Sequence, residues 1–140
     1  LETADFTGFT TPLVTSMAAA MRDCSALTNA SGLGGFDTSN CSSINFFFQN
    51  DANLTTAPDI DGWLIPNLIS ATSFMINVSS VGYGSAWYDA VLNAWEAQTV
   101  QPNVLAHFGN AQYSPAGAAA HASLTDSGTN NWTITDGGPV

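Results

Sequence analysis

FTGF at residues 6–9, LGGF at residues 33–36 and IDGW at residues 60–63 are the stretches that decide the predicted fold. Each has an apolar residue, a glycine and an aromatic residue at the same places, and each follows the one before it by 27 residues. Internal repeats of this length are typical of chains built from stacked supersecondary units. Four further apolar columns keep the same spacing, namely Val14–Cys41–Leu68, Met17–Ile44–Ala71, Met21–Phe48–Met75 and Leu27–Leu54–Val81.

The columns also predict what each unit contains. Val14, Met17 and Met21 lie three and four residues apart, which is the spacing of one face of a short helix. The apolar-x-Gly-aromatic stretch before it predicts a short strand that ends in a sharp turn. Since one strand and one helix cannot bury their own apolar faces, neighbouring units must stack. The predicted fold class is α/β: a short leucine-rich-repeat-type solenoid with parallel strands on one side and short helices on the other.

The predicted organisation is one domain with a regular part and a terminal part. Residues 1–84 hold about three 27-residue repeats, and residues 85–140 form a C-terminal helix–strand–helix–strand capping region of the same domain. The repeats span about 5–31, 32–58 and 59–84. The capping region is predicted to contain a helix at 85–98, a strand at 103–108, a helix at 115–124 that begins after Ser114, and a strand at 131–135.

MRDCSALT at residues 21–28 and GFDTSN at residues 35–40 resemble the repeats of BspA-like leucine-rich-repeat surface proteins. The tail is similar to the end of the same proteins in WYDAVLNAW at 87–95, FGNAQYS at 108–114 and WTITDGG at 132–138. The resemblance implies a microbial surface protein that takes part in adhesion and protein binding, with no catalytic residues in the family pattern. The chain departs from the family in its longer repeat and in LIP at residues 64–66, where Asp-Thr-Ser is expected.

Charge and hydropathy exclude two classes of partner. The 140 residues contain 11 acidic residues and one basic residue, Arg22, which gives a net charge of −10. Such a chain cannot neutralise phosphates, so we expect no nucleic-acid binding. No apolar run approaches the roughly 18 residues of a membrane span, so we expect no membrane insertion. Because Ser, Thr and Asn replace charged residues and lysine is absent, we expect an extracellular or cell-surface location.

Two sets of residues bear on covalent modification. Cys24 and Cys41 either form one disulfide in an oxidising compartment or are two small apolar residues. The N-x-Ser/Thr sequons predict attached glycans, although a chain rich in Ser, Thr and Asn also produces sequons by chance. The candidate acceptors are Asn29, Asn40, Asn53, Asn77 and Asn131.

Catalytic patterns are scarce. His107 in a predicted strand and His121 after an alanine run are both interpreted as structural or surface residues, because no nucleophile-elbow pattern surrounds any serine. Asp59 and Asp61 precede a glycine as in part of a calcium loop, but the remaining ligands are missing. Trp63 and Trp132 either pack in the core or stack on a sugar, and core packing is favoured. The sequence therefore predicts no catalytic residue, cofactor or metal site.

The function predicted from the sequence is a non-catalytic extracellular surface module for protein–protein interaction or adhesion. An alternative is a structural subunit that stacks head to tail into a filament or surface layer, since the first repeat begins without a polar cap. A third hypothesis, a secreted glycoside hydrolase with paired carboxylates, is disfavoured because no pair of acids stands out.

Overall fold

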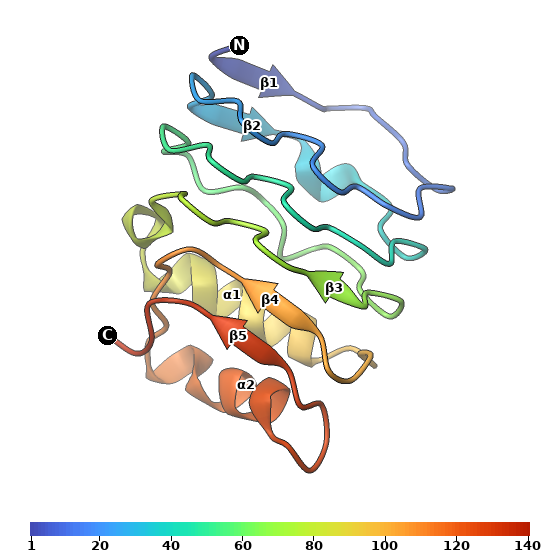
Figure 1. Cartoon of the computed structure of the whole chain (residues 1–140), viewed down its shortest axis with the longest axis vertical. Coiled ribbons are helices and arrows are strands. Elements are labelled where there is room, and N and C mark those ends of the chain that lie inside the picture. The colour runs from blue at the N-terminus through green and yellow to red at the C-terminus, as the bar shows by residue number, and fades with distance from the viewer.

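The computed structural model describes all residues, 1–140, and it contains two small parallel sheets and two α-helices (Figure 1). The predicted fold class is wrong: the chain is not a three-repeat leucine-rich-repeat solenoid. No α-helix occurs before residue 85, and the strands do not form one continuous sheet. The elements are β1 (Thr3–Asp5), β2 (Asn29–Ser31), the 3-10 helix η1 (Leu33–Gly35), β3 (Ser70–Ala71), the 3-10 helix η2 (Ser80–Tyr83), α1 (Ser85–Glu96), β4 (Leu105–His107), α2 (Pro115–Thr125) and β5 (Thr133–Thr135).

The three strands predicted before residue 64 are wrong, whereas β4 and β5 lie inside the strands predicted at residues 103–108 and 131–135. The predicted strand at residues 33–36 is largely the 3-10 helix η1, and residues 6–9 and 60–63 are turns and irregular chain. β1 pairs with β2 in parallel, and β3, β4 and β5 form a second parallel sheet in that order. Isolated parallel bridges join Ser16 to Ser43 and Ser43 to Ser70. The 27-residue spacing therefore appears in the structure as the register of these parallel bridges.

The predicted short helices are absent because the backbone reverses its handedness inside them. Ala19, Phe46 and Ser73 have φ of 60°, 60° and 54°, and a residue in this left-handed region cannot continue a right-handed helix. The amides instead donate to carbonyl groups 26 residues further along the chain. Met17 N donates to the carbonyl of Ser43 at 2.9 Å, and Ala19 N donates to that of Asn45 at 2.8 Å. The apolar spacing of three and four thus belongs to a run of consecutive turns.

The core is continuous and follows most of the apolar columns. Leu33 and Ile60 are fully buried and partly buried Phe6 packs against the same cluster, whereas Val81 leaves its column with 43% of its surface exposed. Val81 belongs to η2, where the chain departs from the 27-residue spacing to enter α1. Most column positions are therefore buried or partly buried, as predicted. Phe9, at 60% exposure, and Val81 are the exceptions.

Both α-helices lie where the sequence predicts them. α1 begins at Ser85 as expected, and Ser114 caps α2 by accepting a hydrogen bond from Ala116 N at 3.1 Å. Pro115 occupies the first helical position, where its missing N–H costs least. The carboxylate of Asp89 on α1 accepts hydrogen bonds from the amide and hydroxyl of Ser114, which fixes the start of α2. Neither helix is long and apolar enough to cross a membrane.

A glycine permits close packing at the turn after β4. Gly109 has φ of +64°, and a Cβ at this position would lie 2.6 Å from the Ser80 hydroxyl and 2.9 Å from the Val78 carbonyl oxygen. Ser80 donates to the Phe108 carbonyl there at 2.7 Å. Gly8 also has positive φ, +83°, but its Cβ would meet nothing within 4 Å. Both glycines thus adopt a positive φ, but only Gly109 lies where there is no space for a side chain.

Candidate functional site

The three-stranded sheet has one face covered by helices and one face open. Figure 1 shows α1 and α2 on the far side of β4 and β5. Ala71, Ala106 and Ile134 are paired across the three strands, and they pack in or against the core on the helix side. Because side chains alternate along a strand, the neighbouring residues point the other way. That open face carries the only pocket of the molecule, an open groove of about 250 Å³ lined by Thr72, Ser73, Leu105, Ala106, His107, Thr133 and Thr135.

The groove contains hydroxyl groups, an imidazole and one large apolar side chain, but no carboxylate or ammonium group. Leu105 is half exposed, at 50% of its surface. Gly109 N donates a hydrogen bond to Nδ1 of His107 at 3.1 Å, which assigns the proton of the neutral ring to Nε2. Burial lowers the pKa of His107, so the ring is neutral at pH 7. The groove is therefore uncharged in a protein of strongly negative charge.

A row of hydroxyl side chains continues from the groove toward the N-terminal segments. Ser16, Ser43 and Ser70 are joined by parallel bridges, and Ser70 is in register with Leu105 and Thr133. Parallel strands lie about 4.8 Å apart, so this row repeats at about that spacing across the molecule. We call the groove together with Ser16, Ser43 and Ser70 the hydroxyl face.

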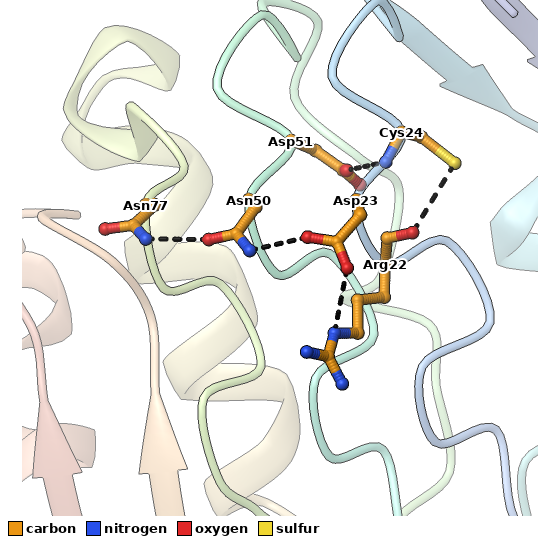
Figure 2. Close-up of polar contacts among 6 residues, drawn as sticks. All are labelled: Arg22, Asp23, Cys24, Asn50, Asp51 and Asn77. Carbon is orange, nitrogen blue, oxygen red and sulfur yellow. Dashed lines mark hydrogen bonds and ion pairs between the residues drawn. The ribbon is translucent and has the colours of Figure 1, made fainter.

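A buried acid lies on another part of the molecule, as Figure 2 shows. Asp51 is fully buried; its Oδ1 accepts a hydrogen bond from Cys24 N at 2.8 Å, while its Oδ2 has no partner. Desolvation raises the pKa of Asp51 to about 7, and the nearby charge of Asp23 adds to the shift. Asp51 is thus a titrating group inside the fold, held against the backbone of Cys24.

A ladder of side-chain amides runs beside Asp51 (Figure 2). Asn77 Nδ2 donates to Asn50 Oδ1 at 2.7 Å, and Asn50 Nδ2 donates to Asp23 Oδ1 at 2.6 Å. All three residues have φ between 61° and 68°, a conformation that Asn and Asp tolerate better than other residues. Arg22 Nε lies 3.1 Å from Asp23 Oδ2, but both side chains are about half exposed, so this ion pair contributes little. The ladder ties together three segments spaced by 27 residues.

Four of the five sequon asparagines make similar contacts, and glycosylation of the five stays a prediction. Asn40 Nδ2 donates to the Pro12 carbonyl at 3.1 Å, and Asn53 Nδ2 donates to the Ser25 carbonyl at 2.7 Å. Asn131 Nδ2 donates to Asn103 Oδ1 at 2.6 Å, and Asn77 belongs to the ladder. Asn29 lies in β2, half buried, and its side chain makes none of these contacts. Four of the five acceptor nitrogens therefore also hold neighbouring segments together.

The structure does not join Cys24 and Cys41, both of which are free thiols. The reason is their position within the repeat spacing: Cys24 aligns with Asp51, whereas Cys41 aligns with Leu68 and is 2% exposed. Burial raises the pKa of both thiols. In this structure Cys41 is a small apolar core residue, and Cys24 is half buried beside Asp51.

His121 belongs to a polar cluster between the two helices and the segment after β5. Its Nε2 lies 3.2 Å from Oδ2 of Asp136, and the same oxygen accepts a hydrogen bond from the Tyr88 hydroxyl at 2.7 Å. The imidazole stacks on Tyr113 with ring centroids 4.5 Å apart. Burial raises the pKa of Tyr88 far above its usual range, so the phenol acts as a donor. The cluster positions α2 against α1 and places no serine or cysteine nucleophile beside the imidazole.

The remaining candidates lie apart from the groove. Trp63 and Trp132 are buried at 0% and 3% exposure, and each indole N–H donates to a backbone carbonyl, so both pack in the core as expected. Asp59 and Asp61 are exposed, and no group of three or more His, Cys, Asp or Glu side chains comes close enough together to hold a metal ion.

Comparison with known proteins adds no relative: no family model, no curated protein and no solved structure matches the chain. The resemblance to BspA-like proteins is therefore carried only by the motifs quoted above, and it stays a prediction.

Most of the groove does not follow from the patterns that predicted the fold. Thr133-Ile134-Thr135, Leu105-Ala106-His107 and Ser70-Ala71-Thr72 share an alternation in which only the middle residue faces the core. The third alternation is obscured because the apolar spacing of Leu68, Ala71 and Met75 predicts a helix there. Asp51 was detectable too, since the 27-residue spacing aligns it with Cys24 and Val78, two residues that pack in or against the core.

Proposed function

We propose that this chain is a non-catalytic extracellular interaction module for adhesion or protein binding, and that the hydroxyl face is its binding surface. The single observation that carries the proposal is the open face of the β3–β4–β5 sheet, where the molecule's one groove lies opposite the helices. Exposed groups on rigid strands are well suited to recognition, because little side-chain and backbone freedom is lost on binding.

The chemistry of the groove supports binding over catalysis. His107 is its only titratable side chain, and one of its ring nitrogens is occupied by the Gly109 amide. An acid–base mechanism needs a second positioned group within hydrogen-bond reach, such as a nucleophile or a carboxylate. The lining residues provide no carboxylate, and no hydrogen bond joins the imidazole to a hydroxyl group, although Thr135 is in register with His107 on the neighbouring strand.

The test is the binding of fluorescently labelled protein to intact bacterial and animal cells, measured by flow cytometry. Leu105→Arg puts a charged side chain into the groove, and we expect it to abolish cell binding. Leu13→Arg is the matched control, because Leu13 is 88% exposed and lies outside the groove, so the same charge change should leave binding intact. Circular dichroism of both variants checks that the fold is retained.

Two outcomes would overturn the proposal: a wild-type protein that binds no cell type, or equal loss of binding in both variants. Light scattering across a concentration series examines the alternative. Reversible growth into fibres by the wild-type chain, without cell binding, would favour the structural subunit.

A further inference from the structure

Three of the four hydroxyl groups that line the groove are free to bind a ligand. Thr133 and Thr135 are exposed, and together with Ser73 they have no hydrogen-bond partner within the protein, whereas Thr72 contacts the Ser70 hydroxyl at 3.1 Å. Each hydroxyl both donates and accepts, so the groove matches a ligand that carries alternating donors and acceptors. His107 Nε2 adds one donor of fixed identity.

Carbon atoms form the rest of the lining. Threonine presents a methyl group beside its hydroxyl, and Leu105 contributes an exposed isobutyl group. The ligand must therefore offer C–H surface as well as hydroxyl groups. A sugar ring has this combination, with hydroxyls around its edge and C–H bonds on its faces.

Charge selects among ligands with hydroxyl groups. The net charge of −10 with a single basic residue repels phosphorylated, sulfated and uronic acid glycans. A cationic ligand finds no carboxylate among the lining residues, so it gains no ion pair in the groove. Of the three kinds of ligand, the groove therefore favours a neutral one. Its hydroxyl groups can be buried against the uncharged lining without leaving a charge unpaired.

Size and shape indicate a segment of an extended polymer. The groove volume of about 250 Å³ is below the about 300–1,000 Å³ of pockets that enclose drug-sized ligands, and the groove is open. The Ser16–Ser43–Ser70 row continues from it in the direction across the strands. A chain of sugar rings lying along this direction meets a polar side chain at each strand separation of about 4.8 Å.

From these observations we infer that the hydroxyl face binds a neutral glycan, with one sugar ring in the groove and further rings along the serine row. This inference rests on the proposed function, because it names the class of ligand that the same surface takes.

The experiment is isothermal titration of the full chain with cellohexaose, laminarihexaose and mannohexaose, with polygalacturonate as an anionic comparison. Thr133→Val and Thr135→Val each remove one hydroxyl and keep the shape and strand preference of the side chain. Loss of one neutral hydrogen bond weakens binding about three- to tenfold. Thr56→Val is the matched control, because Thr56 is exposed and outside the groove.

We expect at least one neutral hexasaccharide to bind the wild-type chain and to bind both groove variants more weakly. Thr56→Val should bind that hexasaccharide as tightly as wild type, and polygalacturonate should not bind. If none of the neutral glycans binds, or the groove variants bind as tightly as wild type, the inference is wrong. Competition in the cell assay separates this result from the proposed function. Suppose that Leu105→Arg abolishes cell binding but that no neutral glycan competes with it. The hydroxyl face would then still be the binding surface, as proposed, and its ligand would be a protein.

Discussion

Replacing Asp51 with asparagine tests whether a titrating acid sits inside the fold. Asp51 is fully buried, its Oδ2 has no partner, and its pKa is raised to about 7 from 3.8. Asparagine keeps a carbonyl oxygen that can accept from Cys24 N, but it does not titrate. Its NH₂ group takes the place of the unpartnered oxygen, at a pH-independent cost of about 1–3 kcal/mol.

The magnitude follows from linkage between protonation and folding. Between pH 4 and pH 7 the folded chain retains a proton on Asp51 that the unfolded chain has released, so raising the pH favours unfolding. A difference of about 3 pKa units at about 1.4 kcal/mol per unit sets an upper bound of about 4 kcal/mol on this effect. About 2 kcal/mol of it falls between pH 5 and pH 7, because Asp51 is still half protonated at pH 7. The lowered pKa of His107 acts in the opposite direction, since a neutral buried histidine gains stability as pH rises toward 6.5, but this contribution is common to both proteins.

The assay is urea-induced unfolding followed by tryptophan fluorescence from pH 5 to pH 8, above the sequence pI of about 4.1 where solubility is lowest. We expect the stability of Asp51→Asn relative to wild type to improve by up to about 2 kcal/mol from pH 5 to pH 7 and to level off toward pH 8. The exposed residue Asp61 provides the control variant Asp61→Asn, whose difference from wild type should not follow this curve. A constant difference between wild type and Asp51→Asn across the range would refute the reasoning.

Three further predictions concern packing and chemistry away from the groove. Asn50→Ala removes both ladder hydrogen bonds and puts alanine at φ of 68°, so the free energy of unfolding should fall by about 2–4 kcal/mol. Asn50→Gly removes the same bonds without the backbone strain and should cost about 1 kcal/mol less. Equal losses for the two variants in urea titrations would contradict the strain at this position. Gly109→Ala should destabilise the fold by about 2–5 kcal/mol and Gly8→Ala by only about 1–2 kcal/mol, because only the Cβ at residue 109 would clash with neighbouring atoms. The opposite order in thermal unfolding would contradict the close packing at Gly109. Cys24 should react with a thiol reagent well before Cys41, and a non-reduced mass spectrum showing a disulfide between them would be incompatible with the two free thiols.

Part of the fold was predictable because it depends on local patterns. The apolar spacing of Trp87, Val91, Leu92 and Trp95 predicts α1. The Ser114–Pro115 pair and the alanine run that follows it predict α2. All of these patterns act within a few residues. The helix assignment for residues 14–21 used the same spacing and was wrong. A single left-handed residue, Ala19, breaks the helix there, and alanine gives no sign of that conformation in the sequence.

The candidate site was predictable only where strand alternation was recognised. Thr133-Ile134-Thr135 lay in a predicted strand, so its two outward threonines could have been expected. The partner positions Thr72 and His107 depend on which strands become neighbours. Between β3 and β4 the offset is 35 residues instead of 27, so the repeat spacing does not supply that register.

The sequence by itself determined the 27-residue register that joins Ser16, Ser43 and Ser70, most of the buried apolar positions and the two helices, because these depend on spacing along one chain. The tertiary structure alone decided the positions of β1, β2 and β3, the amide ladder, the burial of Asp51 and the open groove. These features arise where segments far apart in the sequence meet, and there the backbone hydrogen bonds and side-chain environment are supplied by a neighbour that no local pattern specifies.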